Sequence, residues 1–399
     1  MMRKTLTLAL VAPALLLAGC EFGTKVTQQH GPNGTAIMQV DQKSRLPVIA
    51  PVPPPPYPLT PEMAQGDRAK DVYQNVQVLG DISAEEFNYT MAAITEWIAP
   101  ADGTVENGGC NYCHNPENMA SDELYTKVVA RKMLQMTRSI NSKWTPHFSL
   151  SNYAGKGAGV TCWTCHRGKP VPVAAWTQSL PNPPTILGNK FGQNTPAQSV
   201  AWASLPNDPF TTLLEGKNEI RVGGPSAFPT KHVASIQSTE KTYGLMMHMS
   251  QGLGVNCTYC HNSQNFANWE HSRPQRVNAW YGIRMVRDVN DNYITALGNV
   301  WPANRRGPAG DPAKVYCTTC HRGVNKPLGG QPMLKDYPML RGDYPLAAAA
   351  PAPVPSAPPV AIPETSPVAS PVPVAAADPN PLEALPATTG NSARKTVGG

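Results

Sequence analysis

This sequence of 399 residues has few long apolar runs, a small net charge and little of the alternating pattern that is typical of strands. After the first twenty residues no apolar run reaches the roughly 18 residues of a transmembrane helix, so no further span is expected. The formal net charge is only +6 and is dispersed, which excludes the concentrated basic surface of a nucleic-acid-binding protein. No long alternation of apolar and polar residues appears, so strands are not expected to dominate the fold.

Proline is abundant, and the 43 prolines of the chain are distributed unevenly. They concentrate near residues 47–61 and after residue 343. We therefore expect a Pro-rich tether over residues 20–60 and a Pro/Ala-rich disordered tail over residues 344–399. Residues 61–343 remain for a folded cofactor domain.

The N-terminus has the features of an export signal. Arg3 and Lys4 precede a short apolar run, which ends in Leu-Ala-Gly-Cys at Cys20. This ending resembles a bacterial lipobox, and it predicts a lipoprotein-type signal peptide over residues 1–19 with a diacylglycerol on Cys20. Two acyl chains would anchor the protein at the periplasmic face of the inner membrane. The alternatives are an ordinary signal peptide cut nearby and an uncleaved N-terminal anchor.

Eight of the nine cysteines lie in four Cys-x-x-Cys-His motifs, numbered here in chain order: Cys110/Cys113/His114, Cys162/Cys165/His166, Cys257/Cys260/His261 and Cys317/Cys320/His321. This motif is typical of c-type haem attachment, in which two thiols bind the vinyl groups and the histidine ligates the iron. Zinc sites, redox dithiols and disulfides are the alternatives, but none of them requires a histidine after every pair. The sequence therefore predicts four covalent haems.

The motifs belong to an internal repeat. Motif 1 matches motif 3 in Tyr-Cys-His-Asn, and motif 2 matches motif 4 in Thr-Cys-His-Arg-Gly. Between the motifs, Met136-x-Arg-x-x-Asn matches Met285-x-Arg-x-x-Asn. We predict two dihaem halves related by a pseudo-two-fold, over about residues 61–170 and 229–343, joined by a loop-dominated segment at 171–228.

Four helices are expected around these motifs. Ser83 and Glu86 form a capping box for the first, and Pro274 opens the last. Ser121 and Ser238 are the expected starts of the two between, and Pro146 is the expected end of the second helix. The predicted fold is mainly α, with extensive irregular loops.

Methionines on three of these helices are candidate sixth ligands: Met91 for haem 1, Met133 for haem 2 and Met246 for haem 3. Methionine opposite histidine raises the reduction potential of a haem. Each of the three could instead fill the core, and the nearby methionines compete for the ligand role: Met136, Met247 and Met249.

The repeat places Gly282 opposite Met133, so haem 4 lacks the methionine of its counterpart. His147 follows the Pro146 break and is placed to reach haem 4 as its second axial ligand. A satisfied or exposed histidine is the alternative reading for His147. The remaining histidines outside the motifs are His30, His232, His248 and His271.

Together, these pieces resemble the tetrahaem cytochrome c subunit of the purple-bacterial photosynthetic reaction centre. They include Met91 before Cys-Asn-Tyr-Cys-His, Met133-Leu-Gln-Met-Thr-Arg, Trp-Thr-Pro-His147, Leu-Met246-Met and Cys-Thr-Thr-Cys-His-Arg-Gly. The resemblance implies Met91/His114, Met133/His166, Met246/His261 and His147/His321 as axial pairs.

The resemblance also implies a function. The haems would pass electrons from a soluble cytochrome c or high-potential iron–sulfur protein to the photo-oxidised bacteriochlorophyll special pair of the reaction-centre core. Arg276 would raise the potential of haem 3, unless it is a solvated helix arginine. Every iron has two candidate axial ligands, so an enzyme such as a multihaem reductase is not expected. A membrane-anchored periplasmic electron conduit without a photosystem is the alternative.

Overall fold

The computed structural model describes residues 23–29, 38–149, 159–180, 192–195, 197–216, 218–222 and 235–342. Cys20, the signal segment and the Pro/Ala-rich tail lie outside the described residues. The described residues all belong to one compact unit.

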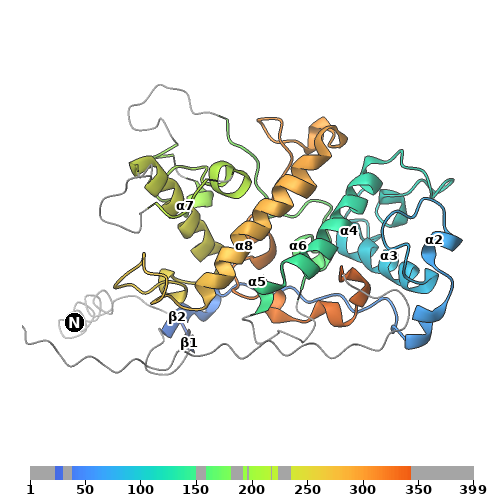
Figure 1. The fold of residues 1–399 in the computed structure, drawn as a ribbon, viewed down its shortest axis with the longest axis horizontal. Helices are drawn as coiled ribbons and strands as arrows, with labels where there is room; N and C mark the ends of the chain where they lie inside the picture. Colours follow the sequence, from blue (N-terminus) through green and yellow to red (C-terminus); the bar gives the residue numbers. More distant parts are fainter. Residues whose placement is uncertain are drawn as a thin grey trace, which may run out of the picture. The chain divides into compact units, whose positions relative to one another are not determined.

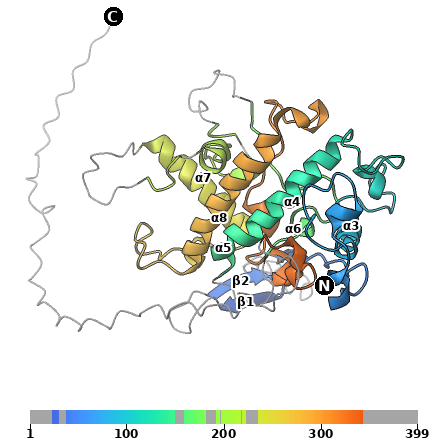
Figure 2. The ribbon, with the colours of Figure 1, turned by 45° about the vertical axis from the view of Figure 1, so that its right-hand side comes forward.

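Four long helices dominate the described residues: α3 (Ala84–Ile98), α4 (Tyr125–Lys143), α7 (Ile236–Leu253) and α8 (Gln275–Val289). Figures 1 and 2 show α3 and α7 at opposite ends of this unit, with α4 and α8 between them. Four one-turn helices accompany them: α2 (Ala69–Val72), α5 (Thr145–Ser149), α6 (Cys162–Cys165) and α9 (Cys317–His321). The expected mainly helical fold with extensive loops is confirmed.

Short 3-10 and π-helical turns make up much of the rest. The 3-10 turns are η1 (Lys43–Arg45), η2 (Pro61–Gln65), η3 (Cys110–Tyr112), η4 (Gln198–Val200), η6 (Cys257–Tyr259), η8 (Thr295–Val300), η9 (Ala303–Arg305), η10 (Pro327–Gly330), η11 (Met333–Lys335) and η12 (Pro338–Leu340). The π-helical turns are η5 (Thr211–Glu215) and η7 (Asn290–Ile294).

Two of the four predicted helix starts are confirmed. The Ser83 hydroxyl accepts the Glu86 amide at 3.0 Å, and the Glu86 carboxylate accepts the Ser83 amide at 3.1 Å, which completes the expected capping box. Helix α8 begins directly after Pro274.

The other two starts differ from the prediction. Helix α4 begins at Tyr125, because the Ser121 hydroxyl accepts the amide of Glu123 and so caps a turn rather than a helix. Helix α7 begins at Ile236, because Ser235 accepts the Ser238 amide at 3.1 Å and is the N-cap. Two serines three residues apart thus compete to cap α7, whereas α4 begins after Leu124 with no side-chain cap.

The expected tether contains the only strands of the described residues. Strand β1 (Lys25–Gln29) pairs antiparallel with β2 (Met38–Gln42). The Gln39 side chain donates to the Gly254 carbonyl at 2.8 Å, at the end of α7. The described part of residues 20–60 therefore contacts the folded domain, which a Pro-rich tether alone does not imply.

The core consists of three clusters. One surrounds Trp97 and Tyr337 beside α3, and a second surrounds Phe210 and Leu245 beside α7. The third joins α4 to α8 through Met136, Ile140, Met285 and Val289. Met136 and Met285, the two methionines that the repeat aligns, thus pack in the same cluster.

No helix among the described residues is long and apolar enough to cross a membrane.

Candidate functional site

Each of the four motifs lies in a single tight turn. Motifs 1 and 3 begin with 3-10 turns, η3 and η6, and motifs 2 and 4 are the short helices α6 and α9. The histidine amide donates to the first cysteine's carbonyl at 3.0 Å in His114, 2.9 Å in His166 and 3.0 Å in His261. In a helical turn, residues three and four apart lie on the same side. The two thiols and the imidazole of one motif can therefore face the same bound group, such as a haem.

The eight motif cysteines form no disulfides in this structure. All eight motif cysteines are free thiols. Burial raises the pKa of Cys162 and of Cys317, the first cysteines of motifs 2 and 4, to about 12, which disfavours reactive thiolates there. The hydrogen bond from Cys165 instead lowers the pKa of Cys320. Among the described residues, no three His, Cys, Asp or Glu side chains gather as they would around a protein-held metal ion. One Cys-x-x-Cys pair in each of four motifs suits thioether attachment to four macrocycles.

The motif histidines share one orienting contact. The Nδ1 atom of each lies within hydrogen-bonding distance of a backbone carbonyl a few residues on: Met119 for His114 (2.9 Å), Lys169 for His166 (2.8 Å), Phe266 for His261 (3.1 Å) and Val324 for His321 (3.0 Å). The spacing is five residues in motifs 1 and 3 and three in motifs 2 and 4. Such a contact fixes Nδ1–H and leaves Nε2 for a metal.

His147, which lies outside the motifs, makes the same kind of Nδ1 contact with a backbone carbonyl as the four motif histidines do. Its Nδ1 lies 2.8 Å from the Asn278 carbonyl, and its ring centre lies 6.2 Å from that of His321. Two metal–imidazole bonds of about 2 Å each, together with two half-rings, need about this separation. Both histidines line one cavity with Cys317, Cys320 and Gly282. The residues of this site therefore fit a c-type haem ligated by two histidines.

Gly282 permits this approach of His147. A Cβ atom at this position would lie 2.8 Å from Cε1 of the His147 ring. The sequence repeat put a glycine here in place of the methionine of the other half, and the structure fills the space with the imidazole.

The candidate methionines differ in burial from most of their competitors. Met91, Met133 and Met246 are half-buried at the borders of the three core clusters. Met136 and Met249 are each only 9% exposed, within the clusters. Burial in the core disfavours Met136 as a ligand. Met249 also lines the cavity that holds His147 and His321, so its low exposure does not exclude it. Met247, which is also half-buried, is not separated from Met246 by this criterion.

Two helices that carry candidate methionines contact motifs in the same way. The Gly168 amide after motif 2 donates to the Trp97 carbonyl of α3 at 2.9 Å. The Gly323 amide after motif 4 donates to the Gly252 carbonyl of α7 at 2.7 Å. Trp97 lies six residues after Met91 and Gly252 lies six residues after Met246. Met91 and Met246 therefore occupy equivalent positions relative to these contacts.

Two asparagines hold the residues that precede motifs 2 and 4. The Asn141 side chain donates to the Val160 carbonyl and accepts its amide, both at 2.8 Å. Asn290 makes the same two bonds to Val315, at 3.0 and 2.9 Å. Each valine lies two residues before the first cysteine. The repeated Met-x-Arg-x-x-Asn pattern thus has a physical role in fixing two motifs against α4 and the end of α8.

Motifs 2 and 4 also touch each other. The Cys165 and Cys320 sulfurs lie 3.2 Å apart. Arg167 donates to the Cys320 carbonyl at 3.3 Å, and Arg322 donates to the Cys165 carbonyl at 2.9 Å. Burial and the charge of Arg322 lower the pKa of Arg167. The recurring His-Arg-Gly was visible in the sequence, but the reciprocal contact was not.

Arg276 is more constrained than a solvated helix arginine. Its guanidinium donates to the Asn268 carbonyl at 2.7 Å and to the Ser272 hydroxyl at 2.6 Å, and it lies over the Trp269 ring at 4.6 Å. Burial is the main cause that lowers its pKa. The backbone amide of Arg273, in the same segment, donates to the Cys260 carbonyl of motif 3 at 3.2 Å, so this segment holds the Arg276 charge next to the motif.

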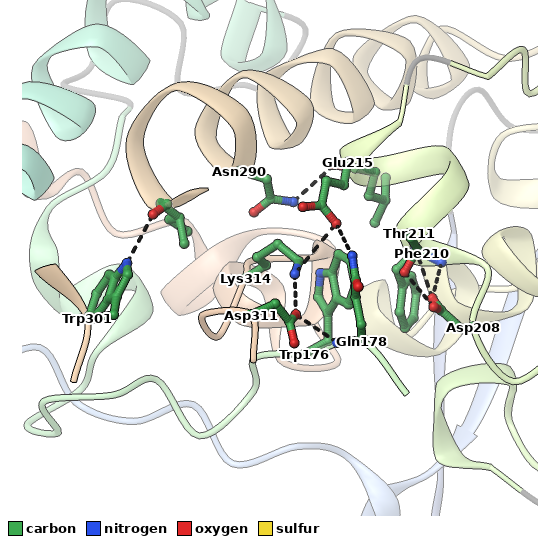
Figure 3. A network of polar contacts seen from close by, with 12 residues as sticks. Trp176, Gln178, Asp208, Phe210, Thr211, Glu215, Asn290, Trp301, Asp311 and Lys314 are labelled. Carbon is green, nitrogen blue, oxygen red and sulfur yellow. Dashed lines mark hydrogen bonds and ion pairs between the residues drawn. The ribbon is translucent and has the colours of Figure 1, made fainter. Parts of the chain in front are cut away.

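A buried lysine, which the sequence gave no sign of, lies before motif 4 (Figure 3). Lys314 is fully buried, forms an ion pair with Asp311 and lies 3.5 Å from a Glu215 carboxylate oxygen. Its ammonium also lies over the Trp176 ring, 4.4 Å from the centre. The backbone amide of Gln178 donates to the Asp311 carboxylate at 2.8 Å. This network joins the segment between the motif pairs to the chain that leads into Cys317.

The whole cofactor region of this chain is similar to proteins of one known family. Residues 22–341 match the family described as photosynthetic reaction centre cytochrome C subunit. Proteins named photosynthetic reaction center cytochrome c subunit are similar to this chain in Rubrivivax gelatinosus (48% identical, covering 88% of this chain and 92% of that protein), Thermochromatium tepidum (45%, covering 87% and 85%) and Roseobacter denitrificans (38%, covering 79% and 85%). The chain therefore belongs to the family of photosynthetic reaction centre cytochrome c subunits.

Proposed function

We propose that this chain is the electron-transfer subunit of a photosynthetic reaction centre and carries four c-type haems. The observation that carries the proposal is the repeated orientation of the four motif histidines, each with Nδ1 at a backbone carbonyl and Nε2 left for iron. Membership of the family supports the electron-transfer role. Covalent c-type haem, once bound, supplies a one-electron iron couple at each motif.

The proposed axial pairs are Met91/His114, Met133/His166, Met246/His261 and His147/His321. Half-burial supports the three methionines, and the 6.2 Å ring separation supports the histidine pair. The carbonyl contact at each Nδ1 would fix the ring and raise the basicity of Nε2. A methionine ligand raises the potential of a haem relative to a second histidine, so on ligation alone haem 4 is expected to have a lower potential than the three histidine/methionine haems.

The two halves are proposed to be dihaem units related by a pseudo-two-fold. Three pairs of equivalent contacts support this: the Asn141 and Asn290 amide pairs, the Trp97 and Gly252 carbonyls, and the reciprocal Arg167 and Arg322 bonds. The proposed domain limits remain about 61–170 and 229–343, with the connection at 171–228.

The proposed path of electrons runs from a soluble cytochrome c or high-potential iron–sulfur protein through the haems to the oxidised special pair. The packing of α3 on α6, α6 on α9 and α9 on α7 supports a continuous path with motifs 2 and 4 at its centre. Arg276, fixed beside motif 3, would disfavour additional positive charge on haem 3 and raise its potential. With two axial ligands on every iron, no coordination position is left for catalysis.

The proposed location is the periplasmic face of the photosynthetic membrane, with lipid on Cys20. Residues 1–19 would be the signal peptide and residues 344–399 a tail outside the cofactor domain.

Haem content and ligation test this proposal. A pyridine haemochrome assay on the purified membrane-bound protein should give four haems per chain. Near-infrared magnetic circular dichroism of the oxidised protein should show three histidine/methionine haems and one bis-histidine haem. Fewer than four haems, or a high-spin iron that binds cyanide, would contradict the proposed cofactor set.

A further inference from the structure

Arg167 and Arg322 form a reciprocal pair at the contact between motifs 2 and 4. Each side chain uses its Nη2 group to hold the carbonyl of a cysteine in the opposite motif. Both residues have left-handed backbone conformations, with φ of 51° and 50°, and each is followed by a glycine. From this same unusual conformation both guanidinium groups reach the shared contact.

The pair leaves donors without acceptors. The Nε atoms of both arginines are buried and have no hydrogen-bond partner among the residues that the structure describes. Within the described part of the chain, neither guanidinium forms an ion pair with Asp or Glu. Two like charges that repel each other, with unpaired buried N–H groups, are costly unless an anion binds beside them. A carboxylate suits such a site, because a guanidinium binds it through two parallel hydrogen bonds.

We propose that Arg167 and Arg322 form a clasp that binds propionate carboxylates of the haems attached at motifs 2 and 4. The inference rests on the proposed function, because it requires haems at both motifs. Each arginine is then a positioning residue for both haems: it holds the backbone of one motif and the carboxylate of a haem. The clasp fixes the two central haems relative to each other, which a path through the middle of the domain requires.

The clasp also places positive charge beside both irons. Such charge disfavours the oxidised state, so it raises the reduction potentials of haems 2 and 4. Because the contacts are reciprocal, the loss of either arginine should affect both haems. An arginine with a purely structural role in its own motif would affect only that motif or none.

The test uses the full-length membrane-bound protein with Arg167→Gln, Arg322→Gln, and the corresponding lysine variants. Equilibrium redox titration at the haem α-bands, with haem 4 identified by its bis-histidine signature, should show lower potentials for haems 2 and 4 in both glutamine variants. We expect at least a tenfold change in the oxidation equilibrium, which is about 59 mV for one electron. Exposed Arg341→Gln is the matched control and should leave all four potentials unchanged.

Resonance Raman spectra report the carboxylates directly. The propionate bending bands should shift in both the glutamine and the lysine variants, because lysine keeps the charge but lacks the planar fork. The lysine variants should recover most of the potential. Unchanged propionate bands and unchanged potentials of haems 2 and 4 would overturn the clasp. The haem count of the unaltered protein separates this result from failure of the proposed function, since fewer than four haems there would count against the function instead.

Discussion

The His147 imidazole occupies the space over Gly282, where a Cβ atom would come within 2.8 Å of the ring. The repeat aligns helices α4 and α8, but the two differ at this position. Helix α4 carries Met133 there, whereas α8 carries Gly282, which leaves room for His147 from α5. One position thus distinguishes the proposed fourth haem site from the proposed second.

The first prediction concerns this glycine. Gly282→Ala should push His147 away and destabilise the protein by about 1–3 kcal/mol, as overpacking does. Near-infrared magnetic circular dichroism should show loss of the bis-histidine band, with the other three haems unchanged. Gly66→Ala is the matched control, because no atom lies within 4 Å of its Cβ position. If Gly282→Ala keeps the bis-histidine band, His147 is not the ligand.

A second prediction separates ligand methionines from core methionines on one helix. Met133→Leu should lower the potential of haem 2, because leucine cannot ligate iron, and electron transfer through that haem should slow. Met136→Leu conserves volume in the core and should cost less than about 1.5 kcal/mol with no change in any potential. Redox titration of both variants is the measurement. The reverse pattern, with Met136→Leu changing haem 2, would exchange the two assignments.

Asp288 provides a pH-dependent prediction. Its carboxylate accepts hydrogen bonds from Trp144 Nε1 at 2.8 Å and Lys143 Nζ at 3.1 Å, and so ties α8 to the chain that leads into His147. Burial acts to raise the pKa of Asp288, but the hydrogen bonds from Trp144, Asn292 and Lys143 together hold it below the ordinary value. The folded state therefore binds this proton less readily than the unfolded state.

The sign follows from that difference. Above the ordinary carboxyl pKa of about 4, Asp288 contributes its full stability, and this contribution is lost as the pH falls through the lower pKa of the folded state. Asp288→Asn should destabilise the protein by about 1–3 kcal/mol near neutral pH and less in acid. Thermal unfolding from pH 7 to 3 measures this. Asp81→Asn, in an exposed pair with Lys70, should change little. Parallel pH curves for wild type and Asp288→Asn would refute this role.

How far the sequence predicts these features depends on how local they are. Ser83 and Pro274 set helix starts locally, Ser83 through the hydrogen bond that its hydroxyl accepts and Pro274 through its fixed backbone angle. Each of the four motifs is likewise a contiguous stretch of sequence. Ser121 misled because a serine hydroxyl caps a turn as readily as a helix, and the choice is made by the residues that follow. The haem-site asymmetry at Gly282 could be inferred only because the repeat supplied a comparison.

Contacts between distant segments were beyond such reasoning. The Arg167–Cys320 bond joins residues 153 apart in the chain, and no local pattern names its acceptor. The Lys314 network similarly draws Trp176, Glu215 and Asp311 from three separate segments. A lysine in the sequence is ordinarily expected at the surface, so its burial becomes visible only with the fold.

The fourth prediction concerns this lysine. Lys314→Met should destabilise the protein by about 3–5 kcal/mol, because it leaves the Asp311 and Glu215 carboxylates without their buried cation. Adding Asp311→Asn should recover part of the loss. Chemical denaturation of the two single variants and the double variant gives the coupling energy. Simple additivity of the single effects would show that the two side chains do not interact.

The most direct test of the central claim is a flash experiment on native membranes that records the haem α-band and the special-pair band together. The account predicts haem oxidation within microseconds, matched in time and amplitude by re-reduction of the special pair. If the haems stay reduced while the special pair recovers by another route, this chain does not donate electrons to the reaction centre, and the account is contradicted.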